Sequence, residues 1–354
     1  MHSIHLEPGR PLREQPDRGH NRWHPELAPV LTVPDGGVVR LELRDSMDGQ
    51  VTRATRDEDL ASLVAISHPL TGPVAVEGAE PGDVLEVEIL EYETDAFGWT
   101  AVIPGLGIVG DLASRPLVVK CELDGGFARS EQLPGIAVSA STHAGVIGVA
   151  PSAELYDAAL AREGALAKLG HPIRMPTPET AFPRDGLRTM PPRENGGNLD
   201  VRDLVAGARL LLPVHVPGAL LSAGDLHFVQ GDGEVSLYGV ECHGAITARL
   251  TIRRDLAWRP TFPAYTAPPR PPREVFATTG IPLRDDGTNA YLDTTVASRR
   301  ALIELIGWLR AEHGLTPEQA IALCSLAAEL RISQIVDLPN ALVSAALPLD
   351  VFTT

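Results

Sequence analysis

Hydrophobic and polar residues alternate strictly along several stretches of the chain. In residues 39–43, three aliphatic side chains alternate with an arginine and a glutamate, and the same period of two recurs in residues 85–89 and 246–253. This period predicts extended strands that bury one face and expose the other. Turn-forming runs such as Pro34-Asp35-Gly36 separate the strands. We therefore expect a mainly β fold with antiparallel sheets.

Two parts of the chain have helical spacing instead. Residues 152–168 are rich in alanine, and apolar residues in the segment 302–309 recur at intervals of three and four. Gly314 then stands where a C-terminal helix cap is expected. The sequence Thr316-Pro317-Glu318-Gln319 is typical of a capping box with proline in the first turn. It predicts a last helix that runs to about Leu330, and we expect these C-terminal helices to cover a sheet.

Polar and proline-rich segments suggest how the chain is divided. We expect an N-terminal arm over residues 1–27, a mainly β region over residues 28–258, a proline-rich connector over residues 259–273, and a C-terminal helical and α/β portion over residues 274–354 that completes the same fold. Residues 171–195 are also proline-rich and are predicted to form a long loop. The predicted fold class is therefore mainly β with a C-terminal α/β portion.

Composition and charge narrow the range of functions. The 354 residues carry a formal net charge of -16, which disfavours contact with a phosphate backbone, so nucleic acid is not expected as a partner. The three cysteines lie far apart, so no disulfide framework is expected. The N-terminus lacks a signal-peptide pattern, and no apolar run approaches the roughly 20 residues of a membrane span. These features predict a cytoplasmic protein with no membrane partner.

The most concentrated chemistry lies in the run Gly224-Asp225-Leu226-His227-Phe228-Val229-Gln230-Gly231-Asp232-Gly233-Glu234. Its glycines permit a tight turn. Its carboxylates, imidazole and carboxamide are the groups that a divalent metal or an acid–base site requires. A solvated acidic hairpin loop is the alternative interpretation. The apolar residues between the polar ones favour a partly buried loop, where a carboxylate is costly unless it is paired or bound to a cation.

Further candidate residues lie in glycine- and proline-rich surroundings. Asn198 and Asp200 are two positions apart and are expected to share one face of an extended segment. His68 and His143 each lie among turn-forming residues, so each is either a site residue or a structural histidine. The run Gly105–Gly110 has the spacing of a dinucleotide-binding loop. A proline soon after it leaves no room for the helix that such a loop requires, so we expect a glycine-rich turn instead.

Taken together, these motifs resemble the acetamidase/formamidase family of amide hydrolases. The likeness is carried by GGNLD (residues 196–200), GDLHFVQGDGE (residues 224–234), HPLTGPVAVEGAEPGDVLEVEI (residues 68–89), IPGLGIVGD (residues 103–111) and AELRISQIVD (residues 328–337). It extends over residues 20–353. The segment Ser141–Gly145 and Leu199 depart from the residues usual in the family. These departures leave the identity of the substrate open more than the class of reaction.

The resemblance implies a mainly β fold with sandwich or barrel parts and hydrolysis of a small non-peptide amide to ammonia and a carboxylate. It also implies a divalent metal, with zinc expected first and calcium as the alternative. As a hypothesis for the metal ligands we take His68, Asp200, Asp225 and His227. Glu234 is the expected general base, and the amide groups of Asn198 and Gln230 are expected to donate to the developing oxyanion. Asp232 is either a further catalytic residue or a residue that stabilises its own turn.

Two other functions stay open from the sequence. One is hydrolysis of a related C–N substrate such as a γ-lactam. Assays with a panel of substrates distinguish this activity from that of a simple amidase. The other is a non-catalytic, metal-stabilised β-sandwich that binds a small ligand, which metal retention without ammonia release would favour. The resemblance also implies a homodimer that acts on a small amide substrate.

Overall fold

The structure is a computed structural model that describes residues 1–171, 181–182 and 185–353. Within these ranges the α-helices are α1 (Ala153–Lys168), α2 (Thr294–His313) and α3 (Pro317–Ala327). The strands are β1 (His2–Ile4), β2 (Gly19–His20), β3 (Arg22–Trp23), β4 (Leu31–Val33), β5 (Gly37–Leu43), β6 (Leu70–Val76), β7 (Val84–Val102), β8 (Leu117–Asp124), β9 (Phe127–Ser130), β10 (Leu133–Ser139), β11 (His143–Gly148), β12 (Leu187–Arg188), β13 (Gly196–Asn198), β14 (Arg209–Pro213), β15 (Leu221–His227), β16 (Glu241–Ile252), β17 (Ala264–Thr266), β18 (Val275–Gly280), β19 (Glu329–Gln334) and β20 (Leu342–Pro348). Strands predominate, which confirms the predicted fold class.

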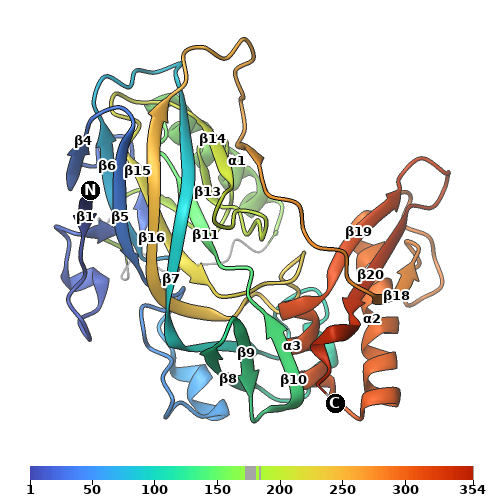
Figure 1. Cartoon of the computed structure of the whole chain (residues 1–354). Helices are drawn as coiled ribbons and strands as arrows, with labels where there is room; N and C mark the ends of the chain where they lie inside the picture. The colour runs from blue at the N-terminus through green and yellow to red at the C-terminus, as the bar shows by residue number, and fades with distance from the viewer. Residues whose placement is uncertain (172–180, 183–184, 354) are drawn as a thin grey trace.

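Most of these strands join in one large sheet that forms the body of the molecule (Figure 1). Its main path runs in the order β10-β9-β8-β7-β16-β15-β11-β13. Other strands branch from this path: β5 pairs with β16, β6 with β15, and β14 with β7. Neighbouring strands on the main path are antiparallel, whereas the β1–β5 and β4–β6 pairs are parallel. The antiparallel pairing along the main path follows the predicted alternation of apolar and polar positions.

The long strand β7 connects the two ends of this body. Its first residues pair with β14 and its last residues, Phe97–Val102, pair with β8, while β16 pairs with it along both parts. The register of the β7–β16 pair shifts at two places, and such irregularities bend a strand. Figure 1 shows β7 running down the centre of the body and then turning toward β8, β9 and β10. The predicted strands at residues 39–43, 85–89 and 246–253 are confirmed as parts of β5, β7 and β16.

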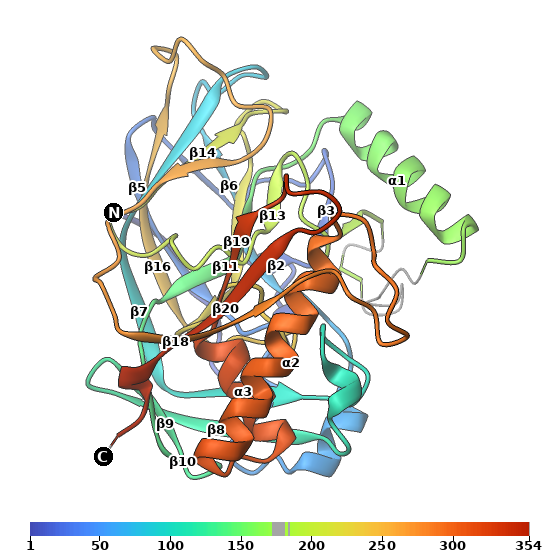
Figure 2. The same cartoon turned by 90° about the vertical axis from the view of Figure 1, so that its right-hand side faces the viewer.

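The C-terminal portion is a small antiparallel sheet, β18-β20-β19, with α2 packed on β18 and β20 (Figures 1 and 2). The Asp293 carboxylate caps α2 at its start, and Gly314 ends it in the left-handed region with φ 66°. The predicted capping box begins α3 at Thr316. This helix ends at Ala327, earlier than predicted, because the chain becomes extended at Ala328 and enters β19. The buried faces of both helices share one hydrophobic cluster with the large sheet.

The N-terminal and proline-rich segments also contribute to the body. In the N-terminal arm, β1 pairs with β5, β2 with β6, and β3 with β12. The helix predicted at residues 152–168 is confirmed as α1, whose first turn is capped by the hydroxyl of Ser152. The connector forms β17, which pairs with β14, before it crosses to the C-terminal portion (Figure 1). Residues 172–180 and 183–184 of the predicted long loop lie outside the described residues.

The three cysteines are buried free thiols, so the expectation of no disulfide framework is confirmed. Burial raises the pKa of the Cys121 and Cys324 thiols to about 12, which keeps both protonated at neutral pH. A helix long and apolar enough to cross a membrane is not found in the part of the chain that the structure describes.

Candidate active site

Three neighbouring strands bring ionisable side chains into one row across the large sheet. The register pairs His227, the last residue of β15, with His143 of β11 on one side and with Glu241 of β16 on the other. The two imidazole rings meet edge to face, with centroids 5.3 Å apart. His227 and His143 have no exposed surface, and Glu241 is 1% exposed. The row therefore lies inside the protein rather than on a solvated loop.

Asp225 joins His227 from two positions earlier on the same strand. Its Oδ1 lies 3.4 Å from Nε2 of His227, and Oε1 of Glu241 lies 2.9 Å from the same nitrogen. Nε2 of His68, in the segment before β6, lies 3.6 Å from Oδ2 of Asp225. Nitrogen and carboxylate oxygens of four residues thus converge on one buried point.

Asp200 and Glu234 also lie near His227, and Oδ1 of Asp200 is 3.9 Å from Nδ1 of its ring. The ligand atoms of Asp200, His227 and Glu234 all lie within 4.8 Å of one another, as do those of Asp225, His227 and Glu241. Asp200 follows β13 and Glu234 lies in the loop between β15 and β16. We call the six residues His68, Asp200, Asp225, His227, Glu234 and Glu241 the acidic cluster.

Three residues of the acidic cluster have left-handed backbone conformations. The φ angles are 48° at Asp200, 56° at Asp225 and 42° at Glu234. Residues other than glycine adopt this region rarely, and such positions are concentrated at functional sites. The chain therefore accepts local strain in order to direct these three carboxylates to one place.

Two glycines leave the space in which the cluster assembles. A Cβ atom on Gly145 would lie 2.7 Å from Oδ1 of Asp200 and 2.8 Å from Oδ2 of Asp225. A Cβ atom on Gly239 would lie 3.0 Å from Cγ of His227. The carbonyl of Gly145 also accepts from the amides of Leu199 and Asp200, which fixes the Asp200 loop on β11.

Gln230 fixes the orientation of the histidine ring. Its Oε1 lies 2.8 Å from Nδ1 of His227 and 3.2 Å from Nε2 of His143. Its amide nitrogen donates to the backbone carbonyl of Asp200 at 3.1 Å. When Nδ1–H of His227 donates to Gln230, the lone pair of Nε2 faces Asp225 and Glu241. Both ends of the carboxamide are thus engaged inside the site, which makes Gln230 an orienting group rather than a free oxyanion donor.

The electrostatics of the cluster are dominated by crowded carboxylates. Burial raises the pKa of Asp200 to about 8 and that of Glu241 to about 7, and neighbouring carboxylates add to both increases. Burial and the charge of Asp200 raise the pKa of Glu234 well above its ordinary value. For Asp225 burial acts the same way, but the charges of His68 and His227 outweigh it and lower the pKa. Four carboxylates cannot all be ionised here without a compensating cation.

The donor set fits a divalent metal. Five polar atoms of the cluster are buried without a hydrogen-bond partner: His68 Nδ1, Asp200 Oδ1, Asp225 Oδ1, His227 Nε2 and Glu241 Oε1. The close contact between His227 and Glu241 is therefore not aligned as a hydrogen bond. Buried polar atoms without partners are costly and rare. Two imidazoles with several carboxylates are a donor set that suits zinc better than calcium, which takes oxygen ligands.

The structure brings together most of the residues expected from the sequence. His68, Asp200, Asp225, His227 and Glu234 belong to the cluster, and Gln230 contacts it directly. Asp232 does not, because its carboxylate pairs with Arg270 at 3.2 Å and is one-third exposed. Asn198 ends β13 two residues before Asp200, and its Oδ1 is buried without a partner.

The local structure of the acidic run differs from the expected loop. Residues up to His227 form the buried strand β15, and only the part from Phe228 onward is a loop. Asp225 and His227 therefore belong to one strand, in which Asp225 is an irregular, left-handed position, and not to a turn.

Glu241 was missed as a site residue by reasoning from the sequence. Glu241 lies between Val240 and Cys242. A single carboxylate between apolar residues of a strand is costly unless it interacts, and this pattern could have indicated a site residue. Its Oε2 accepts from the amide of Ser46 at 3.1 Å, which leaves Oε1 for the cluster. A cavity of about 490 Å³ borders the cluster at Glu241 and is lined by the aromatic residues Phe97 and Trp99.

Comparison with known proteins identifies the family of this chain. The chain matches the model of the Acetamidase/Formamidase family over residues 5–354. It is 33% identical to a formamidase of Methylophilus methylotrophus, covering 96% of this chain and 90% of that protein. It is also 33% identical to an acetamidase of Mycolicibacterium smegmatis, covering 89% of this chain and 87% of that protein. A solved structure of a γ-lactamase from Delftia acidovorans has a TM-score of 0.94 and 31% identity, covering 100% of this chain and 94% of that one. The chain therefore belongs to the acetamidase/formamidase family.

Proposed function

We propose that this protein hydrolyses small linear amides, such as formamide or acetamide, to ammonia and a carboxylate. The observation that carries this proposal is that four carboxylates gather around buried His227 in two groups that share its ring, with His68 beside Asp225. Family membership and the formamidase and acetamidase relatives support the same reaction. An amide needs an activated nucleophile, a polarised carbonyl and a proton for its leaving nitrogen, and this donor set can provide all three.

The proposed metal is zinc, held by the most deeply buried part of the cluster. Asp225, His227 and Glu241 would hold it, with His68 at 3.6 Å from Asp225 as the further ligand. When bound, a divalent metal supplies Lewis-acid polarisation of the carbonyl and a water nucleophile at neutral pH. Gln230 would keep Nε2 of His227 directed at the metal through its hydrogen bond to Nδ1.

Glu234 is the proposed general base and later the general acid. It takes the proton of the attacking water and returns it to the departing nitrogen, so that ammonia can leave. Burial and the charge of Asp200, beside it, raise the pKa of Glu234, which makes ionised Glu234 a stronger base and lets it hold the proton until the nitrogen takes it. Asn198 is the proposed donor to the developing oxyanion, since Gln230 is already engaged.

A γ-lactam is the second candidate substrate. A γ-lactamase structure resembles this one with a TM-score of 0.94 along the whole chain. A lactam contains the same C–N bond closed into a ring, so the same residues could cleave it without release of ammonia.

Ammonia release from formamide and acetamide, and ring opening of a γ-lactam, test the proposal. The protein is assayed as purified, after treatment with a chelator, and after addition of Zn²⁺ to the treated sample. We expect activity that disappears with the metal and returns with zinc. Activity that survives complete metal removal would contradict the metal-assisted mechanism, and absence of hydrolysis of all three compounds by the zinc-loaded protein would contradict the reaction.

We further propose a homodimer in the cytoplasm. The edge strand β19 and the turn after it expose apolar side chains, among them Ile332 and Val336, which are 60% and 71% exposed. Such patches are typical of contacts between proteins. Sedimentation should show a dimer that Val336→Asp weakens, and a monomeric wild-type protein would contradict the proposed dimer.

Cell fractionation tests the proposed location in the cytoplasm.

A further inference from the structure

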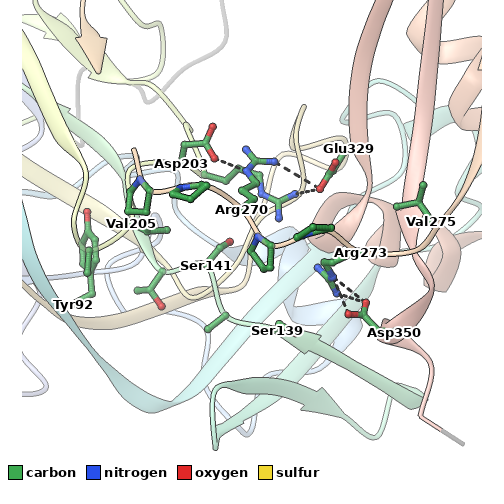
Figure 3. A pocket seen from close by; sticks show the side chains of 18 of the residues that line it. Tyr92, Ser139, Ser141, Asp203, Val205, Arg270, Arg273, Val275, Glu329 and Asp350 are labelled. Atoms are coloured by element: carbon green, nitrogen blue, oxygen red, sulfur yellow. Dashed lines mark hydrogen bonds and ion pairs between the residues drawn. The ribbon is translucent and has the colours of Figure 1, made fainter. Parts of the chain in front are cut away.

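A cavity separate from the acidic cluster lies where the sheet, the connector and the C-terminal portion meet (Figure 3). Its volume is about 920 Å³, and no residue of the acidic cluster lines it. Its walls come from the segment before β11, the loop after Asp200, the prolines of the connector and strand β19. The volume lies within the range typical of small-molecule sites.

Four arginines line this cavity, and three of them are paired with carboxylates. Arg270 binds Asp203, Arg273 binds Asp350 and Arg331 binds Glu329. Figure 3 shows the pairs of Arg270 and Arg273 at the wall of the cavity. Three carboxylates stand against four guanidinium groups among the lining residues, and a fourth carboxylate, Asp232, lies 3.2 Å from Arg270 just outside the lining.

The fourth arginine is Arg202, which shares Glu329 with Arg331 but makes no hydrogen bond to it. This side chain is 8% exposed, and its Nε and Nη1 are buried without a hydrogen-bond partner. Its nearest carboxylate is Glu329, whose Oε1 lies 3.5 Å from Nη1 and also 3.7 Å from Nη1 of Arg270. Burial and the charge of Arg270 lower the pKa of Arg202. A buried guanidinium without hydrogen bonds is costly, so it is a strong recognition group for an added anion.

A second polar group in the same cavity also lacks a partner. The hydroxyl oxygen of Ser141 is buried and makes no hydrogen bond. The remaining wall is largely apolar, with Pro268, Pro271, Val205 and Val275 among its residues. A guanidinium with two nitrogens that lack a hydrogen bond, a hydroxyl without a hydrogen bond and an apolar wall are features that suit a carboxylate attached to an apolar body.

We propose that this cavity is a second binding site, which takes a small organic monocarboxylate through Arg202 and Ser141. A carboxylate supplies the acceptors that Nε and Nη1 of Arg202 lack, whereas a dianion such as phosphate would be repelled more strongly by the carboxylates of Asp203 and Glu329. The proposal does not rest on the amidase function, because none of the catalytic candidates lines the cavity.

Calorimetric titration of the whole protein with benzoate tests the proposal. Benzyl alcohol serves as the neutral analogue and inorganic phosphate as the dianion. Each titration is run on the zinc-loaded protein and on the metal-free protein. We expect saturable binding of benzoate to both forms, and binding of neither control at comparable concentrations. Benzoate binding that disappears with the metal would place the ligand at the acidic cluster and overturn the proposal, as would an absence of saturable binding.

Variants test the assigned residues. Arg202→Gln should weaken benzoate binding at least about tenfold, since it removes the charge-assisted hydrogen bonds to the carboxylate. Arg202→Lys keeps the charge and most of the packing, so it should fold and bind with intermediate affinity. Arg299→Gln removes an arginine that pairs with Asp111 outside the cavity and should bind as the wild type does. If the wild type, Arg202→Lys and Arg202→Gln all bind benzoate with equal affinity, Arg202 is not the residue that holds the ligand.

Discussion

At the scale of single residues, the acidic cluster depends on Gly145 having no side chain. Its φ is not in the left-handed region, so alanine suits the backbone, and only the space is missing. Gly145→Ala would press against Asp200 and Asp225, and we expect it to lower kcat by about 100-fold or more and to reduce bound metal. Measurement of ammonia release and metal content checks this. Gly164→Ala in α1 has open space and should leave both unchanged.

Glu234 is the residue on which the proposed proton transfer depends. Glu234→Gln removes the base but keeps the shape, so kcat should fall by about 10²–10⁴-fold while the metal stays bound. Asp232→Asn, two positions earlier, should have a much smaller effect, because that carboxylate faces Arg270. Parallel assays of hydrolysis and metal content check both variants. Near-normal activity of Glu234→Gln would remove it from the role of base.

Residue types in the sequence were sufficient to select most of the cluster. Asp225, His227 and Glu234 stand out because polar groups of this density amid apolar residues are costly unless they interact. The position of Asp232 could not be predicted, because its partner Arg270 is distant in sequence and only the fold brings them together. For the same reason Glu241 was missed, since its pairing with His227 depends on the register of β15 and β16.

At the scale of elements, the proline-rich connector secures the two loops that carry Asp200 and Glu234. Arg270 stands between two pairs of prolines and binds Asp203 and Asp232, which belong to these loops. It also lies 3.7 Å from Glu329 of β19. Consecutive prolines form a stiff extended chain, so little flexibility is lost when this arginine is held in place. We infer that Arg270 is a positioning residue for the acidic cluster.

Arg270→Gln should therefore lower kcat by about 10- to 100-fold with a smaller change in KM, because the misplaced groups act on the reaction more than on binding. Arg270→Lys should restore part of kcat, which a merely structural role would not predict. Arg273→Gln, in the same connector, breaks the pair with Asp350 and should leave kcat unchanged. Steady-state kinetics, measured at a temperature where all variants are folded, test this positioning role. Equal kcat in Arg270→Gln and the wild type would contradict it.

The elements differ in how well the sequence predicts them. The strands β5, β7 and β16 follow from alternation, and α2 and α3 follow from their caps, because these signals are local. The end of α3 was predicted too late, because Ala328 and Leu330 prolong its apolar spacing although the chain is already extended at Ala328 and enters β19. Likewise β15 reads as a loop in the sequence, although it is buried at every position.

At the scale of the whole molecule, the buried cluster should make metal-free protein less stable as the pH rises. The folded-state pKa of Asp200 is about 8 and that of Glu241 about 7, both raised by burial, and the carboxylates Glu241 and Asp225 raise that of His227 despite its burial. In the unfolded chain these groups titrate near 4 and 6.5. The unfolded state therefore releases its protons first, and stability falls between about pH 5 and pH 9.

Urea unfolding of the metal-free and zinc-loaded proteins at pH 5.5, 7 and 8.5 measures this dependence. We expect the free energy of unfolding of the metal-free form to decrease along the series. Zinc should reduce the decrease, because it balances the carboxylate charges. Asp200→Asn should also reduce it in the metal-free form. A metal-free protein that is more stable at pH 8.5 than at pH 5.5 would contradict the assignment.

The sequence by itself determined the mainly β class, the C-terminal helices and the family, because alternation, caps and contiguous motifs are local properties of the chain. It also determined which side chains have the chemistry for a metal and for proton transfer. Only the tertiary structure decided which of them meet. Strand register places His227 beside Glu241, and the connector brings Arg270 to Asp232. Arg202 makes no hydrogen bond in a cavity whose walls come from at least four separate segments. Contacts between residues distant in sequence depend on which strands pair and in which register, and no local pattern in the sequence determines this pairing.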